Sequence, residues 1–383
     1  MIPPPGYCSP SGNRVCKLTK SLYGLKQASR QWFQKLTSCL ITYGFSQSKF
    51  DSSLFIKFSS NNILILCVCV DDIILAGNNI QEIEAIKAHL DAAFTIKDLG
   101  QLKYFLGIEI ARNKQGITLC QRKYALDLLT ESGYLGCKPC STPMDPKSDL
   151  STTSGDPLPD PSVYRRLVGR LLYLTITRPD LSYSIQTLSQ FMSNPTSTHL
   201  TAAHRVLRYI KSTPGKGLFY SANSPLQLIG FCDADWARCK ETRRSISGFA
   251  IFLGDSLISW KAKKQPTISR SSTETEYRVV ASISCEVQWF VYLLHDMKIQ
   301  HPQPATIYTD NTSAIPITQN PVLHSRTKHI DVRYHFIRDH VEKKDITLEY
   351  ISTDKQLANI FTKPLCESRF EELKNELGLI ELS

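Results

Sequence analysis

The stretch Ile-Leu-Ile-Leu-Cys-Val-Cys-Val-Asp-Asp-Ile-Ile-Leu-Ala-Gly, residues 63–77, contains two runs of β-forming residues separated by a pair of acids. Residues 63–70 and 73–77 are therefore predicted to form the strands of a hairpin, with a tight turn at Asp71-Asp72. The turn holds two carboxylates close together, as Mg²⁺ requires of its oxygen ligands. The alternative is that aspartate is simply a common turn residue, and the stretch taken alone favours that alternative.

Helical and strand patterns alternate over the first 145 residues. Trp32, Leu36 and Leu40 recur at helical spacing, and the same kind of pattern predicts further helices and a second hairpin. The helices are expected at residues 27–43, 81–94 and 123–131, and the second hairpin at 104–111 and 117–121 with a turn at 113–116. Residues 138–162 are rich in Pro, Ser, Thr and Asp, which indicates a linker, and residues 163–215 are predicted to be mainly helical.

The pattern changes near residue 226 to that of an α/β domain. Strands are predicted at 227–232, 247–253, 257–263, 306–308 and 346–351, and helices at 273–295, 330–341 and 355–362, with a short helix after residue 308. Three carboxylates lie at the ends of these elements. Asp233 ends the first strand, Glu276 lies at the start of the long helix, and Asp310 follows a later strand. Carboxylates from separate elements can converge on a metal pair that hydrolyses phosphodiesters.

These carboxylates also have structural explanations. Thr273-Glu274-Thr275-Glu276 matches a capping box, in which Glu276 would only accept a hydrogen bond from a backbone N–H. Asp310-Asn311 would cap a following helix. Spacing alone leaves the structural and the functional explanations equally favoured.

The composition is that of a globular chain. Apolar residues make up 42% of the 383 residues, which excludes a disordered protein, and the formal net charge of +10 is compatible with a polyanionic partner. The 12 cysteines include one Cys-x-x-Cys, at Cys137 and Cys140, without a second pair at zinc spacing, and they indicate a reducing compartment. The N-terminal residues do not have the pattern of a signal peptide, so secretion is not expected. The run at 63–76 is too short and too acidic to cross a membrane.

Several longer sequence motifs resemble motifs of the copia-type (Pseudoviridae) retrotransposon Pol polyproteins. The motifs similar to the reverse transcriptase of this family are Ser21-Leu-Tyr-Gly-Leu-Lys-Gln-Ala-Ser-Arg-Gln-Trp32, Val70-Asp71-Asp72-Ile73, and Asp98-Leu99-Gly100 with Tyr104-Phe-Leu-Gly-Ile-Glu-Ile110. Those similar to its connection region are Tyr164-Arg-Arg-Leu-Val-Gly169 and Leu174-Thr-Ile-Thr-Arg-Pro-Asp180. Those similar to its ribonuclease H domain are Asp233-Ala-Asp-Trp-Ala237, Ser271-Ser-Thr-Glu-Thr-Glu-Tyr277, Thr309-Asp-Asn311 and Arg326-Thr-Lys-His-Ile-Asp331.

This resemblance implies an α+β and α/β chain: part of a reverse-transcriptase palm and thumb, a helical connection, and a ribonuclease H-like domain with a mixed five-stranded sheet. The expected boundaries are 1–145 for the partial reverse transcriptase, 146–225 for the linker and connection, 226–365 for the ribonuclease H-like domain and 366–383 for a C-terminal helical tail. Residues 226–365 are expected to be the independently stable part.

The resemblance also implies the chemistry. Asp71 and Asp72 match the paired polymerase aspartates, and Asp233, Glu276 and Asp310 match three of the four ribonuclease H carboxylates. Each site is expected to bind two Mg²⁺ ions, with Mn²⁺ as a possible substitute. The expected partners are an RNA–DNA hybrid, an RNA template with a DNA primer, and dNTPs. The expected nucleic-acid contacts are Leu106, Gly107, Arg205, Arg208, Lys211 and Lys263. The arginines and lysines among them would equally fit a solvated surface without a ligand.

Three departures from the family pattern lower the expected activity. The third polymerase aspartate of the family lies upstream of the segment that matches Pro4-Pro5-Gly6-Tyr7, so a truncated and inactive polymerase is expected. Cys69 replaces the tyrosine that precedes Val-Asp-Asp in the family. Asn359 replaces the fourth ribonuclease H carboxylate and would be a weaker, neutral metal ligand, so that ribonuclease H is expected to be weakened or inactive.

A different class of function remains open at the level of sequence. The chain would then be a non-enzymatic remnant, which binds nucleic acid or does nothing. The family resemblance is compatible with virus-like particles, the cytoplasm and the nucleus, and the oligomeric state is not predicted.

Overall fold

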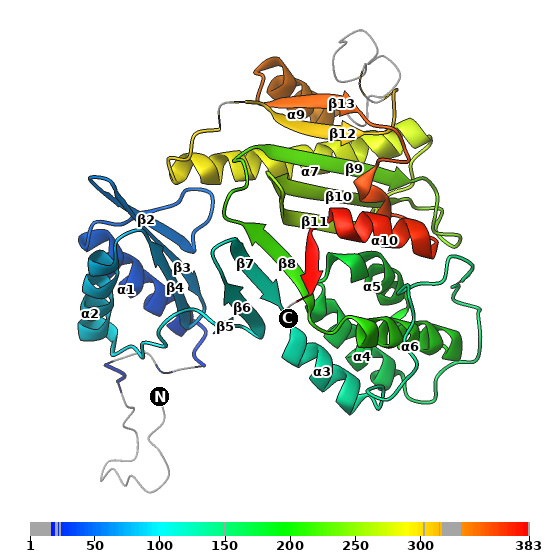
Figure 1. Cartoon of the computed structure of the whole chain (residues 1–383), viewed down its shortest axis with the longest axis horizontal. Helices are drawn as coiled ribbons and strands as arrows, with labels where there is room; N and C mark the ends of the chain where they lie inside the picture. The colour runs from blue at the N-terminus through cyan, green and yellow to red at the C-terminus, as the bar shows by residue number, and fades with distance from the viewer. Residues whose placement is uncertain are drawn as a thin grey trace, which may run out of the picture. The chain divides into compact units, whose positions relative to one another are not determined.

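The computed structural model describes residues 17–19, 22, 24–148, 150–301, 303–313, 315 and 331–381. The chain forms two compact units (Figure 1). Unit 1 comprises Met1–Gly100 with Asp296–Lys298, and unit 2 comprises Gln101–His295 with Ile299–Ser383. The four-part division expected from the sequence stays a prediction. None of the described helices has the length and apolar character needed to cross a membrane.

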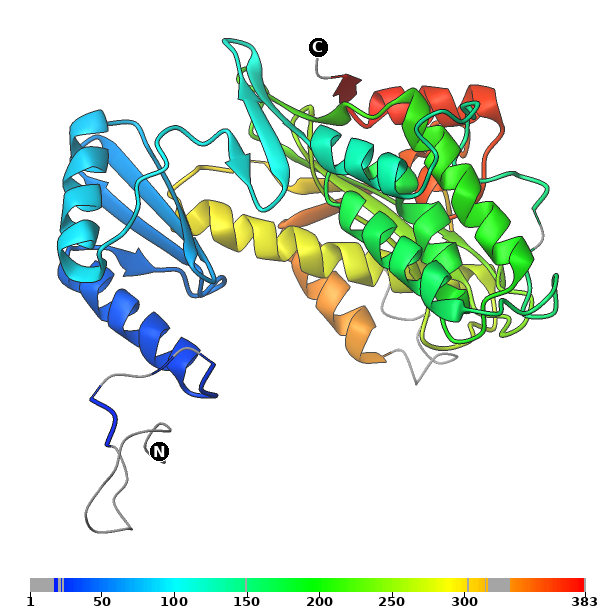
Figure 2. The ribbon, with the colours of Figure 1, turned by 90° about the horizontal axis from the view of Figure 1, so that it is seen from below.

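Unit 1 is a small antiparallel sheet covered by two helices. The strands are β1 (Ser46–Gln47), β2 (Leu54–Ser59), β3 (Asn62–Cys69) and β4 (Asp72–Gly77), in the order β1-β2-β3-β4, and the helices are α1 (Ala28–Thr42) and α2 (Ile80–Phe94). Leu64, Leu66 and Val68 alternate along β3 and pack in one core with Leu36 of α1 and Ile86 of α2. Both helices therefore cover the same face of the sheet (Figure 2).

The β3–β4 hairpin lies one residue earlier than expected. Cys69 pairs with Asp72, so the two turn residues are Val70 and Asp71, and Asp72 is already the first residue of β4. Val70 has a φ of 55°. This is a left-handed conformation that β-branched residues rarely adopt, and twisted two-residue hairpins require it at their first turn position. The predicted turn at Asp71-Asp72 was therefore wrong by one residue.

Unit 2 contains a second antiparallel sheet and a group of helices. The sheet order is β14-β8-β7-β6-β5, made of β5 (Tyr104–Phe105), β6 (Ile108–Arg112), β7 (Gly116–Cys120), β8 (Lys216–Ser221) and β14 (Leu379–Glu381). The helical elements are α3 (Arg122–Glu131), α4 (Pro161–Leu174), η1 (Pro179–Leu181), α5 (Ser182–Leu188), η2 (Ser189–Phe191), α6 (Ser197–Ser212) and α10 (Glu367–Glu376).

The third sheet carries the carboxylates expected to be catalytic. Its order is β11-β10-β9-β12-β13, made of β9 (Leu228–Asp235), β10 (Ile246–Leu253), β11 (Ser256–Lys264), β12 (Ala305–Thr309) and β13 (Ile346–Tyr350). β9, β10 and β11 are antiparallel neighbours, whereas β12 is parallel to both β9 and β13. This confirms the predicted mixed five-stranded sheet. The helices are α7 (Ser272–Asp296) and α9 (Asp331–Glu342).

Two predicted helices in this part need comment. The short helix expected after residue 308 falls largely outside the described residues. The helix expected at 355–362 was wrong, because the chain forms only a 3-10 turn, η4 (Leu357–Phe361). The Gln356 side chain caps this turn by accepting a hydrogen bond from the N–H of Ala358, and it also donates to the carbonyl of Cys232 in β9. Contacts with the sheet thus override the local helical pattern.

The interior of unit 2 joins its helices to the carboxylate-bearing sheet. One hydrophobic core contains Leu128 of α3, Leu171 of α4, Phe252 of β10 and Phe370 of α10. The sequence boundaries at 145, 225 and 365 would therefore divide residues that share a core.

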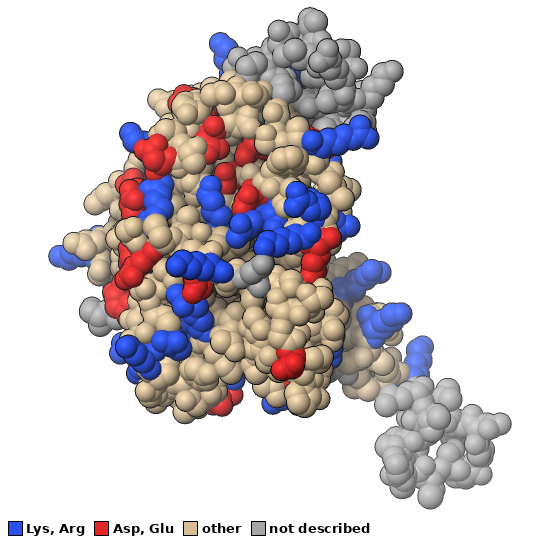
Figure 3. All heavy atoms as spheres, turned by 90° about the vertical axis from the view of Figure 1, so that its right-hand side faces the viewer, with Lys and Arg blue, Asp and Glu red and all other residues tan. Residues whose placement is uncertain are grey.

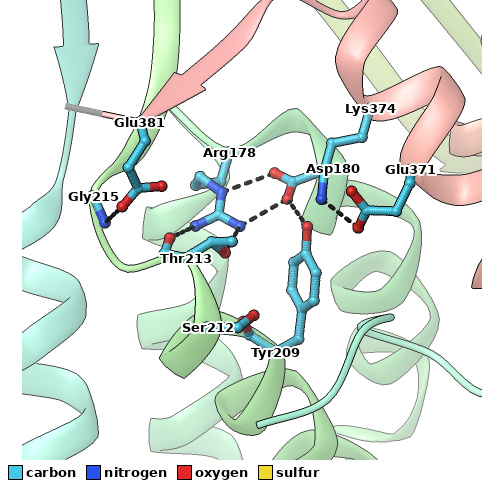
Figure 4. A network of polar contacts seen from close by, with 9 residues as sticks. All are labelled: Arg178, Asp180, Tyr209, Ser212, Thr213, Gly215, Glu371, Lys374 and Glu381. Carbon is cyan, nitrogen blue, oxygen red and sulfur yellow. Dashed lines mark hydrogen bonds and ion pairs between the residues drawn. The ribbon is translucent and has the colours of Figure 1, made fainter. Parts of the chain in front are cut away.

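A buried ionic network lies beside this core (Figure 4). The Arg178 guanidinium donates to both carboxylate oxygens of Asp180, at 2.9 and 2.7 Å, and the Tyr209 hydroxyl donates to the same carboxylate at 2.6 Å. Each of the three residues is 1% exposed. Lys374 of α10 is also buried and pairs with Glu371.

Candidate metal centre

Three carboxylates converge at one end of the mixed sheet. Ligand oxygens of Asp233, Glu276 and Asp310 all lie within 4.8 Å of one another. Parallel pairing aligns Cys232 of β9 with Thr309 of β12, which places the next residues, Asp233 and Asp310, side by side. Glu276 comes from α7. Among the described residues, this is the cluster of three acidic, histidine or cysteine side chains that is compact enough to hold a metal ion.

The helix cap of α7 is formed by other residues than expected. Glu274 accepts a hydrogen bond from the N–H of Arg270, and the Ser271 hydroxyl accepts one from the N–H of Glu274. The Ser271 hydroxyl therefore caps the helix at the N–H of Glu274, whereas the Glu274 carboxylate bonds to Arg270, one residue before the cap. Glu274 also forms an ion pair with Arg278 at 2.7 Å. The structural role proposed for Glu276 was therefore wrong, and Glu276 is left to join the cluster.

The environment of the cluster disfavours negative charge. Burial, the largest cause, raises the pKa of Asp233 to about 6, although Lys363 and the Thr362 hydroxyl act in the opposite direction. Burial together with Asp233 and Asp310 raises the pKa of Glu276 well above its ordinary value. Oε1 of Glu276 accepts a hydrogen bond from the N–H of Ala234 at 3.2 Å, but its buried Oε2 has no hydrogen-bond partner among the described residues. A bound cation would satisfy this oxygen and favour the ionised carboxylates.

Residues that the sequence argument missed hold these carboxylates in place. The Thr362 hydroxyl donates to Asp233, and the Lys363 ammonium lies 4.0 Å from the same carboxylate. The Thr353 hydroxyl donates to Asp310 at 2.8 Å. Gln356, which is fully buried, donates to the carbonyls of Cys232 and Tyr308, at 2.9 and 3.4 Å, and so joins β9 to β12. No spacing rule finds these residues, because they act from about 40 to 130 positions away.

Asn359 lies in the same hydrogen-bonded group. Its side-chain nitrogen donates to the Thr353 carbonyl at 2.9 Å, and its backbone carbonyl accepts from Thr362 at 3.3 Å. Its buried Oδ1 has no hydrogen-bond partner in the part of the chain that the structure describes. A neutral amide oxygen thus remains available, but its role as a metal ligand stays a prediction.

Asp71 and Asp72 lie in unit 1 and have a different environment. Both are exposed at the tip of the β3–β4 hairpin. They form no group of three potential metal-binding side chains with another described residue. The sequence therefore placed these two carboxylates correctly on a hairpin, whereas their catalytic role stays a prediction.

The predicted nucleic-acid contacts have mixed surroundings. Arg205 donates to the Thr142 carbonyl at 3.2 Å, and Arg208 donates to the Lys138 carbonyl at 2.8 Å, so both hold the segment before α4. Lys211 is in the last turn of α6, and Lys263 is exposed on β11. At the β5–β6 turn, which has positive φ at both residues, the carbonyl of Leu106 accepts a hydrogen bond from Tyr173, and the same tyrosine would contact a Cβ at Gly107. Contact of these six residues with phosphates stays a prediction.

Comparisons with known proteins give a consistent result. Residues 1–146 match the family described as reverse transcriptase (RNA-dependent DNA polymerase). The chain is 44% identical over 380 residues to the retrovirus-related Pol polyprotein from transposon RE1 of Arabidopsis thaliana, covering 99% of this chain and 26% of that protein. It is 32% identical over 288 residues to a putative transposon Ty5-1 protein of Saccharomyces cerevisiae, covering 74% of this chain and 94% of that protein.

Similarity to solved structures is weaker. A foamy viral protease-reverse transcriptase in complex with RNA/DNA hybrid has a TM-score of 0.46 and 14% identity, and the match covers 90% of this chain and 40% of that chain. The chain spans about a quarter of the length of the RE1 polyprotein.

Proposed function

Because the chain belongs to the copia-type retrotransposon Pol polyproteins, we propose that unit 2 hydrolyses the RNA strand of RNA–DNA hybrids. The observation that carries this proposal is the convergence of Asp233, Glu276 and Asp310 at the end of the mixed sheet. Phosphodiester hydrolysis of this type uses carboxylates that hold divalent metal ions next to the scissile phosphate.

Mg²⁺ fits this set of donors. Hard cations bind oxygen ligands, and the cluster supplies three carboxylates. The pKa values of Asp233 and Glu276 are raised, so a nearby cation would stabilise the ionised form of both side chains. A pair of Mg²⁺ ions, when bound, activates water and stabilises the leaving oxygen. The buried Oε2 of Glu276, which has no hydrogen-bond partner among the described residues, supports a cation at this position.

The side chains of the protein orient the carboxylates for this reaction. The hydrogen bond from Thr362 fixes one oxygen of Asp233, and that from Thr353 fixes one oxygen of Asp310. The backbone N–H of Ala234 fixes Oε1 of Glu276 and leaves Oε2 available. Lys363 supplies a positive charge 4.0 Å from Asp233, where it would also attract a phosphate.

Asn359 is expected to reduce the activity without removing it. If its Oδ1 is the fourth ligand, it contributes an oxygen without a charge, so that Mg²⁺ binds more weakly than in a site of four carboxylates. Cleavage should therefore require higher Mg²⁺ concentrations, and Mn²⁺ should support it as well.

The test is cleavage of a labelled RNA–DNA hybrid by the full chain with Mg²⁺ or Mn²⁺. Cleavage should depend on the metal and should fall by at least about 100-fold in Asp233→Asn, since the variant removes a metal-binding charge. Asp255→Asn is a matched control, because Asp255 is an exposed acid in the β10–β11 turn of the same sheet. No cleavage by the wild-type chain in excess metal would contradict the proposal, and equal cleavage by Asp233→Asn would reveal a contaminating nuclease.

RNA-directed DNA synthesis is the second candidate. It is favoured by the family match over residues 1–146, which includes the hairpin of Asp71 and Asp72. We expect no synthesis by this chain alone, because the described residues supply two carboxylates there and not three. Extension of a DNA primer on an RNA template with Mg²⁺ and dNTPs, lost in Asp72→Asn, would show the opposite.

A non-enzymatic role predicts a different pair of results. The chain would bind hybrid duplex without cleaving it, and the affinity would fall steeply as salt is added. Absence of both binding and cleavage would indicate an inert remnant.

A further inference from the structure

A polar cavity of about 260 Å³ lies in unit 2 next to the loop that joins β9 to β10. Its lining comes from four separate parts of the chain: the segment before α4, the α5–η2 region, the β9–β10 loop with the start of β10, and Pro364 after η4. At about 30 Å³ for each water molecule in the liquid, the cavity has room for about nine waters, or for a phosphate with part of its sugar.

Positive charge dominates the described lining. Lys147, Arg238 and Lys240 all contribute to it, and we call this space the basic cavity. Glu241 is the described acid in the lining, and it accepts a hydrogen bond from the N–H of Thr152. Figure 3 looks at the side of the molecule toward which β9 runs in Figure 1, and it shows Lys and Arg side chains gathered across the middle of this face.

The surroundings of Cys239 in the basic cavity favour the ionised form of its thiol. Cys239 belongs to the lining, and the Lys264 ammonium lies 3.8 Å from its sulfur. Although burial opposes ionisation, hydrogen bonds from Thr242 together with Lys264 lower the pKa of the Cys239 thiol. An environment that favours a thiolate also favours other anions.

Arg238 is well placed to bind an anion. Its Nε lies 3.6 Å from Asp235, and its side chain is 39% exposed. A guanidinium has five N–H donors in a planar fork, which matches the oxygens of a phosphate. The contacts with Asp235 and Tyr183 leave donors of this fork for a further partner.

Two residues that line the basic cavity are linked to the carboxylate cluster through their neighbours. Pro364, which lines the cavity, follows Lys363, whose ammonium lies 4.0 Å from Asp233. On the other side, Arg238 contacts Asp235, two residues beyond Asp233 in β9. A polynucleotide strand with one phosphate at the cluster would carry further phosphates at intervals of one nucleotide.

We propose that the basic cavity binds a backbone phosphate of a polynucleotide strand whose neighbouring segment lies at the carboxylate cluster. The identity of the strand rests on the proposed function, whereas the phosphate chemistry rests on Lys147, Arg238 and Lys240. Side chains of the segment before α4 and of α5 thereby become part of the substrate site of the mixed sheet.

The first experiment measures hybrid affinity against salt by fluorescence anisotropy, with Ca²⁺ in place of Mg²⁺ to suppress cleavage. Arg238→Gln and Lys147→Gln should each reduce the slope of log affinity against log salt by about 1 and weaken binding about tenfold near 0.1 M salt. Arg238→Lys should retain most of the slope. Lys114→Gln is the matched control, because Lys114 is exposed at the β6–β7 turn and does not line the basic cavity.

The second experiment locates the phosphate. Inorganic phosphate, and separately the hybrid, should slow the alkylation of Cys239 by iodoacetamide, followed by mass spectrometry. Cys366 is the internal control, because it is exposed, a hydrogen bond with Ser368 lowers its pKa, and it lies outside the cavity lining. Its alkylation should not change.

The outcomes separate the two proposals. Wild-type slope and affinity in both glutamine variants would overturn the phosphate site even if Asp233-dependent cleavage is observed. Protection of Cys239 by inorganic phosphate without any hybrid binding would leave a site for free phosphate, and would overturn its polynucleotide occupant together with the proposed function. Equal protection of Cys239 and Cys366, or of neither, would also overturn the site.

Discussion

At the scale of single residues, Asn359 offers the sharpest test of the metal centre. Asn359→Asp would add a fourth carboxylate where a buried amide oxygen now has no described partner. The variant should bind Mg²⁺ at least about tenfold more tightly, because one additional ligand charge changes the binding free energy by more than about 1.4 kcal/mol in a buried site. Calorimetric titration with Mg²⁺ gives the affinity.

The same variant has an expected cost without metal. A further buried carboxylate repels Asp233 and Glu276, so Asn359→Asp should unfold at a lower temperature in EDTA and show a larger rise in Tm when Mg²⁺ is added. If Asn359 is not a ligand, Asn359→Ala should leave the Mg²⁺ affinity unchanged. An unchanged affinity in Asn359→Asp would remove this residue from the site.

The raised pKa of Asp233 predicts a pH dependence of stability. The folded value of about 6 exceeds the ordinary 3.8, so between these values the native state holds a proton that the unfolded state has lost. The metal-free free energy of unfolding should therefore fall as pH rises from about 4 to 6, by about 1.4 kcal/mol for each unit of pKa difference. Asp233→Asn should flatten this fall, as measured by thermal unfolding in EDTA. A steeper fall in the variant would contradict the prediction.

At the scale of elements, local patterns predicted most of the helices and strands. The periodicity of α7 and the β-rich runs of β3, β4, β9, β10 and β11 are local properties, and these elements were found close to their predicted bounds. β8 and β14 were not predicted, because their pairing with each other joins residues about 160 positions apart and β14 has only three residues. The segment of η4 has a local helical pattern and was therefore predicted as a helix. The contacts that hold it as a 3-10 turn, from the flanking Gln356 to Cys232 and from Thr362 to Asp233, are not local and could not be seen in that pattern.

The hairpin of unit 1 provides a test of backbone strain. Val70 has a φ of 55° and is 78% exposed, so replacing it loses little packing. Val70→Gly should stabilise unit 1 by up to about 1 kcal/mol, because the left-handed conformation costs an L-residue about 1–2 kcal/mol, and the larger backbone entropy that glycine loses on folding offsets part of that gain. Slower hydrogen exchange of the β3 and β4 amides would show it. Val70→Ala keeps the Cβ and should recover less.

The candidate site was only partly accessible to sequence reasoning. Asp233, Glu276 and Asp310 could be predicted because the motifs around them resemble those of the ribonuclease H domain, whereas their positions alone left a structural role equally favoured. The structure brings them together. Thr353 and Thr362 could not, because their hydrogen bonds to Asp310 and Asp233 depend on the tertiary fold. The basic cavity was missed for the same reason, since its lining combines four distant segments.

At the scale of the whole molecule, the buried network of Arg178, Asp180 and Tyr209 predicts a large stability effect. Asp180→Ala should destabilise unit 2 by about 3–5 kcal/mol, because it leaves the buried Arg178 charge without its carboxylate. Tyr209→Phe removes one hydrogen bond and should cost about 1–3 kcal/mol. Urea denaturation measures both.

A surface ion pair supplies the control for this prediction. Arg338 and Glu342 are partly exposed neighbours on α9, and Glu342→Gln should change the stability by less than about 1 kcal/mol. Equal effects of Asp180→Ala and Glu342→Gln would show that the network does not stabilise the fold.

The position of α10 and β14 has a consequence for biosynthesis. Phe370 and Leu373 belong to the core of unit 2, and Leu379 pairs with Leu218 of β8, more than 150 residues earlier in the chain. Translation delivers β8 and the entire carboxylate-bearing sheet before these residues leave the ribosome. The nascent chain must therefore leave the edge of β8 unpaired and the core residues that contact α10 exposed. Unit 2 reaches its complete fold only after residue 379 has left the exit tunnel.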